Sequence, residues 1–598
     1  MAADLELETV RVAGATPPSL APRRDLTWLR RLRVWLVLVP AAMLLVQGWH
    51  QRWLSDDGFI HVRVAEQVLA GHGFVFNATE RVEASTSPLW VAVLALARVP
   101  HLFRLEAAAV VIGLISTTAG LLLAAWGARL LWRPEGVLPV GATVLAVLPP
   151  MWDFATSGLE VGLVFLWLGG CFRLLARLTV SDEPRWSQLR LVAFVAGAGP
   201  LIRPDLILFT GVFLLAALFR ASQVTPRPWR QLPALLGLAL TMPCAYQLFR
   251  MGYYGSLVPS TALAKEASRA WWTQGWRYLL DLVGPYRLWV PLSAVLLLLA
   301  AEARRWLRSR STHRLVITAA PLVGGTAHAL YITRVGGDFM HGRLLLPALF
   351  ALLMPVAVIE VRGWRRGAAA AVVAVWAVVC LGWLRPSHVA GRNGTDMVAA
   401  GIADERAFYA ALAGRHNPVD VDDYASSGLY AHGLAARRLG RPTLGFLTPD
   451  PGRPYGSVAL RPDVPFHTAF ATPNVGITAV IAGTDVHIID VGGLADPVAS
   501  RLRLAARGRP GHEKRLDLAW ILARFADPRA PIPEGVSAPA VRAAHHALRC
   551  GPLRDVQEAA TRPLTIARFA RNVGVSVRLR SFRLDSDPAV AEAKLCRS

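Results

Sequence analysis

"RRLRVWLVLVPAAMLLVQGWHQRWLSDDGF", residues 30–59, decides the class of fold. An apolar run long enough to cross a bilayer follows a cluster of arginines and leads to two adjacent carboxylates, Asp56 and Asp57. The run has no small-residue cleavage site, so we expect it to stay as a membrane anchor and not to be removed as a signal peptide. The stretch therefore predicts a membrane protein whose first external loop begins with two acids.

The composition extends this prediction to the whole chain. Of its 598 residues 54% are hydrophobic, and the mean hydropathy is +0.39, which is too apolar for a soluble protein of this size. The formal net charge is +23, but the basic residues lie mostly in short clusters between apolar runs, and the chain has no nucleic-acid-binding motif. The charge therefore reports membrane topology and not nucleic-acid binding.

Eleven apolar runs predict eleven membrane spans. The stretch 88–104 is ambiguous between a further span and a helix on the membrane surface. We treat it as interfacial, because the five Arg-rich loops then all fall on the cytoplasmic side together with the N-terminal tail. The predicted spans cover roughly 32–50, 106–131, 136–151, 159–178, 189–203, 204–220, 230–250, 286–303, 314–333, 343–361 and 367–385.

An odd number of spans places the C-terminus outside. The predicted organisation is a cytoplasmic tail over 1–31, a membrane domain over 32–385 and an external domain over 386–598. In the external domain, 475–483 and 486–493 are predicted as buried strands. The segments 496–508, 517–526 and 537–550 are predicted as helices, which makes the domain mixed α/β.

Polar residues from six separate loops fall on the outer face in this topology. Each motif has an ordinary structural interpretation: Ser55 can cap a helix that starts at the acid pair, "RPD" at 203–205 can be a turn between helices, and Lys265 can reach the lipid headgroups. Ionisable groups near a bilayer are costly, however, and a converging set indicates a functional site. The candidates are Asp56, Asp57, Glu83, Glu160, Arg203, Asp205, Tyr253, Tyr254, Lys265, Arg334, Asp338, His341 and Arg343.

These motifs, in this order, resemble one family. "DDGFIHVRVAEQVLAGHGFVFNATERVEASTSPLW", "TSGLE", "RPD", "YYGSLVPSTALAK" and "GGDFM" are similar to membrane glycosyltransferases of the GT-C class, and specifically to the actinobacterial terminal β-(1→2)-arabinofuranosyltransferases of the AftB type. "GLADPVASRL" and "RPGHEK" are similar to the C-terminal domain of the same family. This chain has "TSPLW" and "PST" where family members often have "TNPLW" and "PNT".

The resemblance implies a reaction in the bacterial plasma membrane. The donor would be decaprenyl-phosphoryl-arabinofuranose, and the acceptor would be the arabinan of arabinogalactan or lipoarabinomannan outside the cell. Arg203, Lys265, Arg334 and Arg343 would bind the donor phosphate. Asp56 or Asp57 would act on the acceptor hydroxyl as general base. Glu83, Glu160, Asp205, Tyr253, Tyr254, Asp338 and His341 would contact substrate.

Three questions stay open at this point. A β-linked donor and a β-linked product mean net retention, which leaves a carboxylate nucleophile or departure and attack on one face as alternatives. No cofactor is certain, although the acids could hold Mg²⁺ or Mn²⁺. The competing functions are another polyprenyl-phosphate-sugar transferase, for example a mannosyltransferase, and a non-catalytic transporter or envelope-assembly protein. A transporter is expected to show repeated halves, which the sequence lacks.

The cysteines divide between the two predicted domains. Cys171, Cys244 and Cys380 lie in apolar runs and are expected to be packing residues. Cys550 and Cys596 lie in the external domain, which faces an oxidising compartment where disulfides persist. We expect them to form a disulfide that fixes the C-terminus and takes no part in the chemistry; two free thiols are the alternative.

Overall fold

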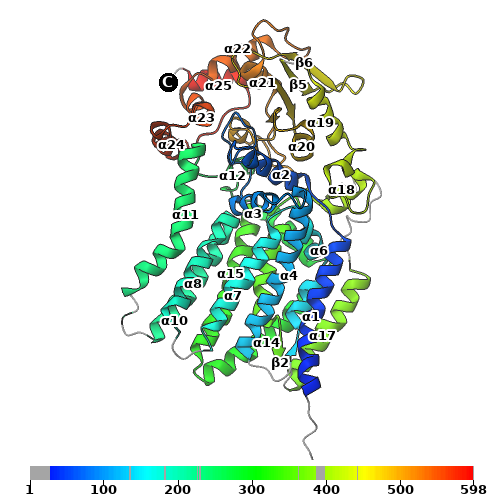
Figure 1. Cartoon of the computed structure of the whole chain (residues 1–598), viewed down its shortest axis with the longest axis vertical. Helices are drawn as coiled ribbons and strands as arrows, with labels where there is room; N and C mark the ends of the chain where they lie inside the picture. The colour runs from blue at the N-terminus through cyan, green and yellow to red at the C-terminus, as the bar shows by residue number, and fades with distance from the viewer. Residues whose placement is uncertain are drawn as a thin grey trace, which may run out of the picture.

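The computed structural model describes residues 27–132, 137–180, 184–224, 227, 230–360, 363–384, 398–399, 401–440 and 442–596. A helical bundle occupies one end of the molecule and the C-terminal α/β domain the other, with α2 (Asp56–Leu69) and α3 (Pro88–Arg98) between them (Figure 1). Residues 1–26 of the predicted tail, and most of the polar segment that joins the two predicted domains, lie outside the described residues.

The bundle contains a helix in every range predicted to span. Its long helices are α1 (Thr27–His50), α4 (Leu105–Trp132), α7 (Val161–Arg177), α10 (Ile207–Val224), α11 (Leu232–Tyr254), α14 (Trp289–Arg308), α15 (Thr312–Val335) and α17 (Trp364–Gly382). The shorter ones are α5 (Val140–Ala146), α6 (Pro149–Thr156), α8 (Trp186–Gly197), α9 (Gly199–Ile202), α12 (Ser260–Ala264), α13 (Trp272–Val283) and α16 (Leu346–Leu353).

Length and composition identify a helical membrane protein. Within the described residues, five helices are long and apolar enough to cross a bilayer, or six if α6 and α7, which meet at 108°, form one broken span. The range 136–151, predicted as one span, is instead a short strand β1 (Val137–Leu138) followed by α5 and then the start of α6. A proline pair, Pro149 and Pro150, begins α6 and explains the break. The count of eleven spans stays a prediction.

Glycines bring α4 and α7 into backbone contact. A Cβ on Gly162 would lie 2.2 Å from the carbonyl oxygen of Gly113, and one on Gly169 would lie 2.3 Å from that of Gly120. The two pairs are seven residues apart on both helices, so they lie on the same face of each helix and allow the backbones to approach closely there. Small residues that allow such an approach are typical of helix pairs in membranes.

Two short helices separate the bundle from the C-terminal domain. α2 begins where the sequence predicts, because the Ser55 side chain caps it by accepting a hydrogen bond from the Gly58 N–H at 2.9 Å. α3 has 11 residues, which is about 16 Å and too short to cross a bilayer. This length agrees with the interfacial interpretation of 88–104.

The C-terminal domain is mixed α/β, as predicted. Its four-stranded sheet has the order β6-β5-β7-β8; β5 pairs antiparallel with β6 and parallel with β7, and β7 pairs parallel with β8. The strands are β5 (Thr443–Leu447), β6 (Tyr455–Ala459), β7 (Thr468–Thr472) and β8 (His487–Asp490). The helices are α18 (Glu405–Ala413), α19 (Gly428–Arg438), α20 (Gly476–Ala482), α21 (Leu518–Phe525), α22 (Ala538–Ala547), α23 (Gly551–Thr561), α24 (Ile566–Arg578) and α25 (Pro588–Leu595).

Two of the predicted elements in this domain are wrong. The segment 475–483, predicted as a strand, forms α20, because a short apolar run fits a buried helix as well as a strand. The segment 496–508, predicted as a helix, contains only a 3₁₀ turn at Ala499–Arg501. Backbone hydrogen bonds join Arg501 and Arg503 to Leu584 and hold the chain extended after that turn. Strand β8 and helices α21 and α22 lie where they were predicted.

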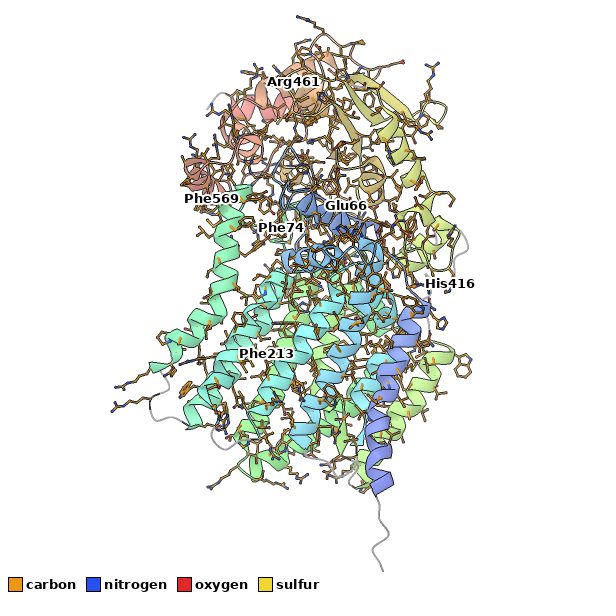
Figure 2. All side chains as sticks on the ribbon, viewed as in Figure 1. Glu66, Phe74, Phe213, His416, Arg461 and Phe569 are labelled. Carbon is orange, nitrogen blue, oxygen red and sulfur yellow. A yellow bond between two sulfur atoms is a disulfide. The ribbon has the colours of Figure 1, made fainter. Side chains whose placement is uncertain are left out.

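The C-terminal domain contacts the bundle through α24 as well as through α2. The ring of Phe569 on α24 lies against Gly252 near the end of α11, where a Cβ would come within 2.2 Å of it (Figure 2). The Asn572 side chain donates to the Gly252 carbonyl at 2.9 Å. The start of α11 and the end of α10 lie at the opposite end of the bundle (Figure 1).

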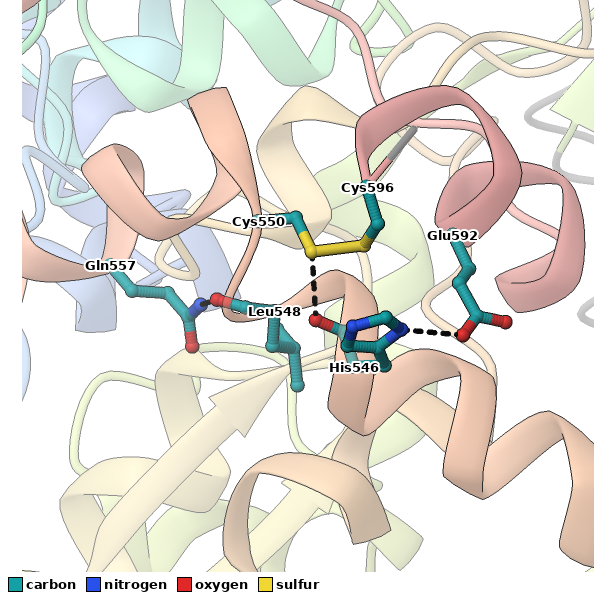
Figure 3. Close-up of a disulfide and its surroundings, with 6 residues drawn as sticks. All are labelled: His546, Leu548, Cys550, Gln557, Glu592 and Cys596. Atoms are coloured by element: carbon teal, nitrogen blue, oxygen red, sulfur yellow. Dashed lines mark hydrogen bonds and ion pairs between the residues drawn. A yellow bond between two sulfur atoms is a disulfide. The ribbon is translucent and has the colours of Figure 1, made fainter. Parts of the chain in front are cut away.

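The pair Cys550 and Cys596 is bonded in the structure, with an S–S distance of 2.10 Å (Figure 3). The bond joins the start of α23 to the end of α25, and the His546 imidazole beside it contacts Glu592 at 2.7 Å. Of the other cysteines, Cys171 and Cys380 are buried as expected of packing residues, whereas Cys244 is exposed on α11.

Candidate active site

A cavity of about 490 Å³ lies where the bundle meets the C-terminal domain. Residues from α2, from the ends of several bundle helices and from the C-terminal domain line it together. Of the residues predicted to form the site, those that line it are Asp57, Glu160, Arg203, Asp205, Lys265 and Arg343.

The two adjacent acids at the start of α2 have different environments. The Asp56 carboxylate is buried and accepts hydrogen bonds from the N–H groups of Ile477 at 2.7 Å and Gly476 at 3.2 Å. It thus caps α20 of the C-terminal domain and does not line the cavity. Burial raises the pKa of Asp56 to about 6, although the two backbone hydrogen bonds oppose the rise.

Asp57 is the acid that faces the cavity. Its side chain is 23% exposed, and its nearest cation is the Arg343 guanidinium at 3.7 Å. Arg343 is itself buried and contacts the Asp338 carboxylate at 2.6 Å, so it is fixed behind the cavity wall. At this separation the guanidinium attracts the Asp57 carboxylate but makes no close hydrogen bond to it.

The "GGDFMHGR" segment places Asp338 and Arg343. Gly336, Gly337 and Gly342 have φ values of +97°, +73° and +69°, a conformation that glycine adopts without strain. A Cβ on Gly337 would also lie 2.3 Å from the ring of Tyr278, so the segment passes close to α13. Burial raises the pKa of Asp338, but the charges of Arg343 and Lys265 outweigh it, and the pKa lies below its usual value.

A second ionic group lies on the bundle side of the cavity. Arg203 donates to both oxygens of Asp205, at 3.1 and 2.8 Å, and lies 3.7 Å from Glu160. His61 lies 3.6 Å from Glu160, and His328 lies 2.6 Å from Asp205. The Nη1 of Arg203 has no hydrogen-bond partner within the described residues, although Arg203 is buried and lines the cavity. Part of the hydrogen-bonding capacity of this guanidinium is therefore not used by the surrounding described residues.

The C-terminal domain contributes three arginines to the cavity that the sequence did not reveal: Arg507, Arg580 and Arg583. Arg583 contacts Glu266 at 2.9 Å, and Lys514 contacts the other side of the same carboxylate oxygen at 2.9 Å. Arg507 lies just before "RPGHEKR", and Arg580 and Arg583 lie in "RLRSFR" at 578–583; both are short basic clusters of a kind that many solvent-exposed loops also show. With these arginines, six cationic side chains and three carboxylates line the cavity, and the surplus suits an anion.

The remaining predicted residues do not line this cavity. Glu83 is buried and paired with Arg250 at 2.6 Å; Tyr253 stacks on Phe249, and Tyr254 donates to the Phe74 carbonyl. His341 lies between Asp281 and Tyr286, and the Arg334 side chain is exposed. Their contacts support the walls of the site, and we do not assign them to substrate binding.

The donor set around the cavity does not match a divalent cation. Within the described residues, the one group of three side chains at metal-ligand spacing is His546 with Cys550 and Cys596, whose sulfurs form the disulfide. Glu160 and Asp205 each face a cationic side chain, and carboxylates so paired are poor ligands for Mg²⁺ or Mn²⁺.

Comparisons with known proteins agree with the sequence motifs. Residues 463–594 match the family model described as the AftB family C-terminal domain. The terminal β-(1→2)-arabinofuranosyltransferase of Mycobacterium tuberculosis is 36% identical over 93% of this chain and 96% of its own length. The enzyme of the same name from Corynebacterium glutamicum is 34% identical over 90% of this chain and 84% of its own.

Among solved structures, the crystal structure of ArnT from Cupriavidus metallidurans bound to undecaprenyl phosphate aligns with 69% of this chain and 72% of its own. The sequence identity is 14% and the TM-score is 0.38. A TM-score and an identity this low do not support any inference about the function of the chain.

Proposed function

The chain belongs to the AftB family of terminal β-(1→2)-arabinofuranosyltransferases, and on that premise we propose that it transfers arabinofuranose from a polyprenyl-phosphate donor to the ends of arabinan chains. The observation that carries the proposal is the cavity between the bundle and the C-terminal domain. It combines a surplus of cationic side chains with one carboxylate, Asp57, that is not in a close ion pair.

The donor we propose is decaprenyl-phosphoryl-arabinofuranose. Its phosphate carries negative charge that increases as the sugar leaves, so cationic donors bind it more strongly in the transition state than in the ground state. Arg203, with its unpaired Nη1, and Lys265 line the cavity on the bundle side, where the phosphate of a membrane lipid would enter. Arg507 approaches from the C-terminal domain and completes the binding site for the phosphate.

Asp57 is the acting carboxylate in this proposal. It takes the proton from the acceptor hydroxyl as that oxygen attacks the anomeric carbon, and the departing phosphate leaves as an anion held by the arginines. Arg343 lies 3.7 Å from Asp57, and its contact with Asp338 fixes Arg343 in place. Asp56 serves the reaction indirectly, because its hydrogen bonds to α20 fix the start of α2 on which Asp57 lies.

Retention of the β configuration follows most simply from departure and attack on one face of the sugar. Retention by double displacement needs a second carboxylate that is available as nucleophile or base. The other carboxylates that line the cavity, Glu160 and Asp205, both face Arg203 and a histidine. We therefore propose that Asp57 acts alone as base and forms no glycosyl-enzyme intermediate.

The multi-pass chain is proposed to lie in the bacterial plasma membrane with the cavity and the C-terminal domain on the external side. The Arg-rich connections between predicted spans support this orientation. A reporter fused after residue 310 should then report cytoplasm, and one fused after residue 400 should report the outside. Two reporters on the same side would contradict the eleven-span topology.

Transfer by the purified protein tests the proposed function. The full chain in detergent or nanodiscs would be given radiolabelled decaprenyl-phosphoryl-arabinofuranose and a synthetic arabinofuranose oligosaccharide. We expect a β-(1→2)-linked terminal residue that needs both substrates, and the same preparation should not accept polyprenyl-phosphoryl-mannose. Transfer of mannose and not of arabinose would refute the choice of donor.

A further inference from the structure

A second cavity, of about 660 Å³, lies between the loop that follows α2 and the C-terminal domain. It shares no lining residue with the cavity that holds Asp57. Its walls come from residues 72–79, from the end of α19 and from the segments that flank β7 and β8. The reaction proposed above uses none of these residues, so the cavity needs an explanation of its own.

The lining of this second cavity is polar but carries almost no net charge. Arg437 and Asp485 balance each other, and His72, His467 and Thr79 add further donors and acceptors. Phe466 also lines the cavity, and its ring stacks on His487 at 4.2 Å. Burial, together with the charges of Arg524 and Arg63, lowers the pKa of His487 to about 3, so that ring is uncharged.

This chemistry favours a neutral ligand with many hydroxyl groups. A phosphate would require a surplus of cations, and a divalent cation would require several carboxylates; the lining has one arginine and one carboxylate. A cavity with mixed hydrogen-bonding groups and a ring beside them is typical of a binding site for a small polar molecule. A segment of a neutral oligosaccharide meets these requirements.

Side chains of α2 hold the wall of the second cavity in place. The Arg63 guanidinium, which is fully buried, donates to the carbonyls of Ala479 at 3.3 Å and Val486 at 3.1 Å. Gln67 donates to the Thr484 carbonyl at 3.4 Å and contacts His72 at 2.7 Å. The wall is therefore formed before any ligand arrives, which reduces the entropic cost of binding.

We propose that this second cavity binds the acceptor glycan at a distance from the end that reacts. The inference rests on the proposed function for the identity of the sugar, which is arabinofuranose. α2 connects the two sites, because Asp57 lies at its start and His72 lies just beyond its end. The twelve residues from Asp57 to Leu69 at the end of α2 correspond to roughly 18 Å of helix, so only a long acceptor reaches both cavities.

Kinetics with acceptors of two lengths test the inference. The double variant His467→Ala/Asp485→Ala removes two lining side chains that make no hydrogen bond within the described residues. Because the charge of Asp485 acts on the buried Arg63, thermal unfolding of the variant is measured on the same samples and should match that of the wild type. We expect the KM for a long arabinofuranose oligosaccharide to rise about tenfold, the effect of losing two hydrogen bonds, while kcat stays unchanged. The KM for an arabinofuranose disaccharide and for the lipid donor should not change. The control His545→Ala, on α22 outside the cavity, should leave every constant unchanged.

An equal rise of KM for both acceptors, or no rise for the long one, would overturn the inference. A separate binding measurement distinguishes an error in the glycan site from an error in the proposed function. In the Asp57→Asn background, calorimetry with the long oligosaccharide should show a Kd about tenfold weaker when the His467/Asp485 changes are added. If the wild-type protein transfers no arabinofuranose but this binding difference persists, the glycan site stands and the proposed reaction is wrong. If transfer occurs and the binding difference is absent, the glycan site is wrong.

Discussion

Replacing Gly476 by alanine should move α20 of the C-terminal domain away from the start of α2, the helix that carries Asp57. A Cβ at Gly476 would lie 1.9 Å from the carbonyl oxygen of Asp56 and 2.9 Å from its Oδ1. Ordinary contact begins near 3.4 Å, so the starts of α20 and α2 must move apart by about 1.5 Å, at a typical overpacking cost of about 1–3 kcal/mol. Asp57 is the next residue on α2 and should move with it. A displacement of this size at a catalytic group lowers turnover on the order of 100-fold.

The assay is initial-rate transfer by the full chain in nanodiscs, with thermal unfolding measured on the same samples. We expect kcat to fall about 100-fold and the KM for the lipid donor to change little, because the phosphate-binding arginines do not contact Gly476. Gly428→Ala is the matched control: it also changes a glycine at the start of a helix in the same domain, and a Cβ there meets no atom within 4 Å. Wild-type turnover in Gly476→Ala would refute the role given to the contact between α2 and α20.

Two further predictions concern Asp56 and the disulfide. In the folded protein the pKa of Asp56 is raised from 3.8 to about 6. Protonated Asp56 therefore contributes to the free energy of unfolding, fully below pH 3.8, and this contribution is lost as the pH rises through 6. In Asp56→Asn the free energy of unfolding should change with pH by about 3 kcal/mol less over that window, so the Tm should also change less with pH. The variant should keep most of the transfer activity. A dependence of Tm on pH equal to that of the wild type would contradict the buried environment of Asp56. Cys550→Ser/Cys596→Ser should lower the stability of the C-terminal domain by about 4 kcal/mol and leave kcat near wild type. A non-reduced digest should contain the linked peptides, and alkylation of both cysteines without reduction would rule the bond out.

The membrane helices were predictable because their signal is local. A run of apolar residues between arginines, such as that of α1, identifies a helix without knowledge of its neighbours. The break between α5 and α6 was missed, because the run over 136–151 has the composition of a span and Pro149 is compatible with either a kink or a new helix. The α20 helix was missed for a related reason: its N-terminal cap, the Asp56 carboxylate, is 420 residues away in sequence.

The sequence predicted which polar residues lie near the cavity better than it predicted the role of each one. The motifs that converge on the cavity could be found because ionisable groups beside apolar runs are rare in a membrane protein. The sequence could not separate Asp56 from Asp57, since their environments differ only through α20 and Arg343. It also could not identify Arg507, Arg580 and Arg583, because their approach to the cavity depends on how the C-terminal domain packs on the bundle.

Replacing each of the two adjacent acids in turn shows which of them acts as the base. Asp57→Asn and Asp56→Asn would be purified from the same expression system, shown to have comparable Tm values, and assayed for arabinofuranose transfer from the lipid donor. We expect Asp57→Asn to lose at least about 100-fold in kcat, the contribution of a general base, while Asp56→Asn retains transfer within about tenfold of wild type. Wild-type turnover in Asp57→Asn, or loss of transfer in Asp56→Asn alone, would contradict the assignment of Asp57 as the base.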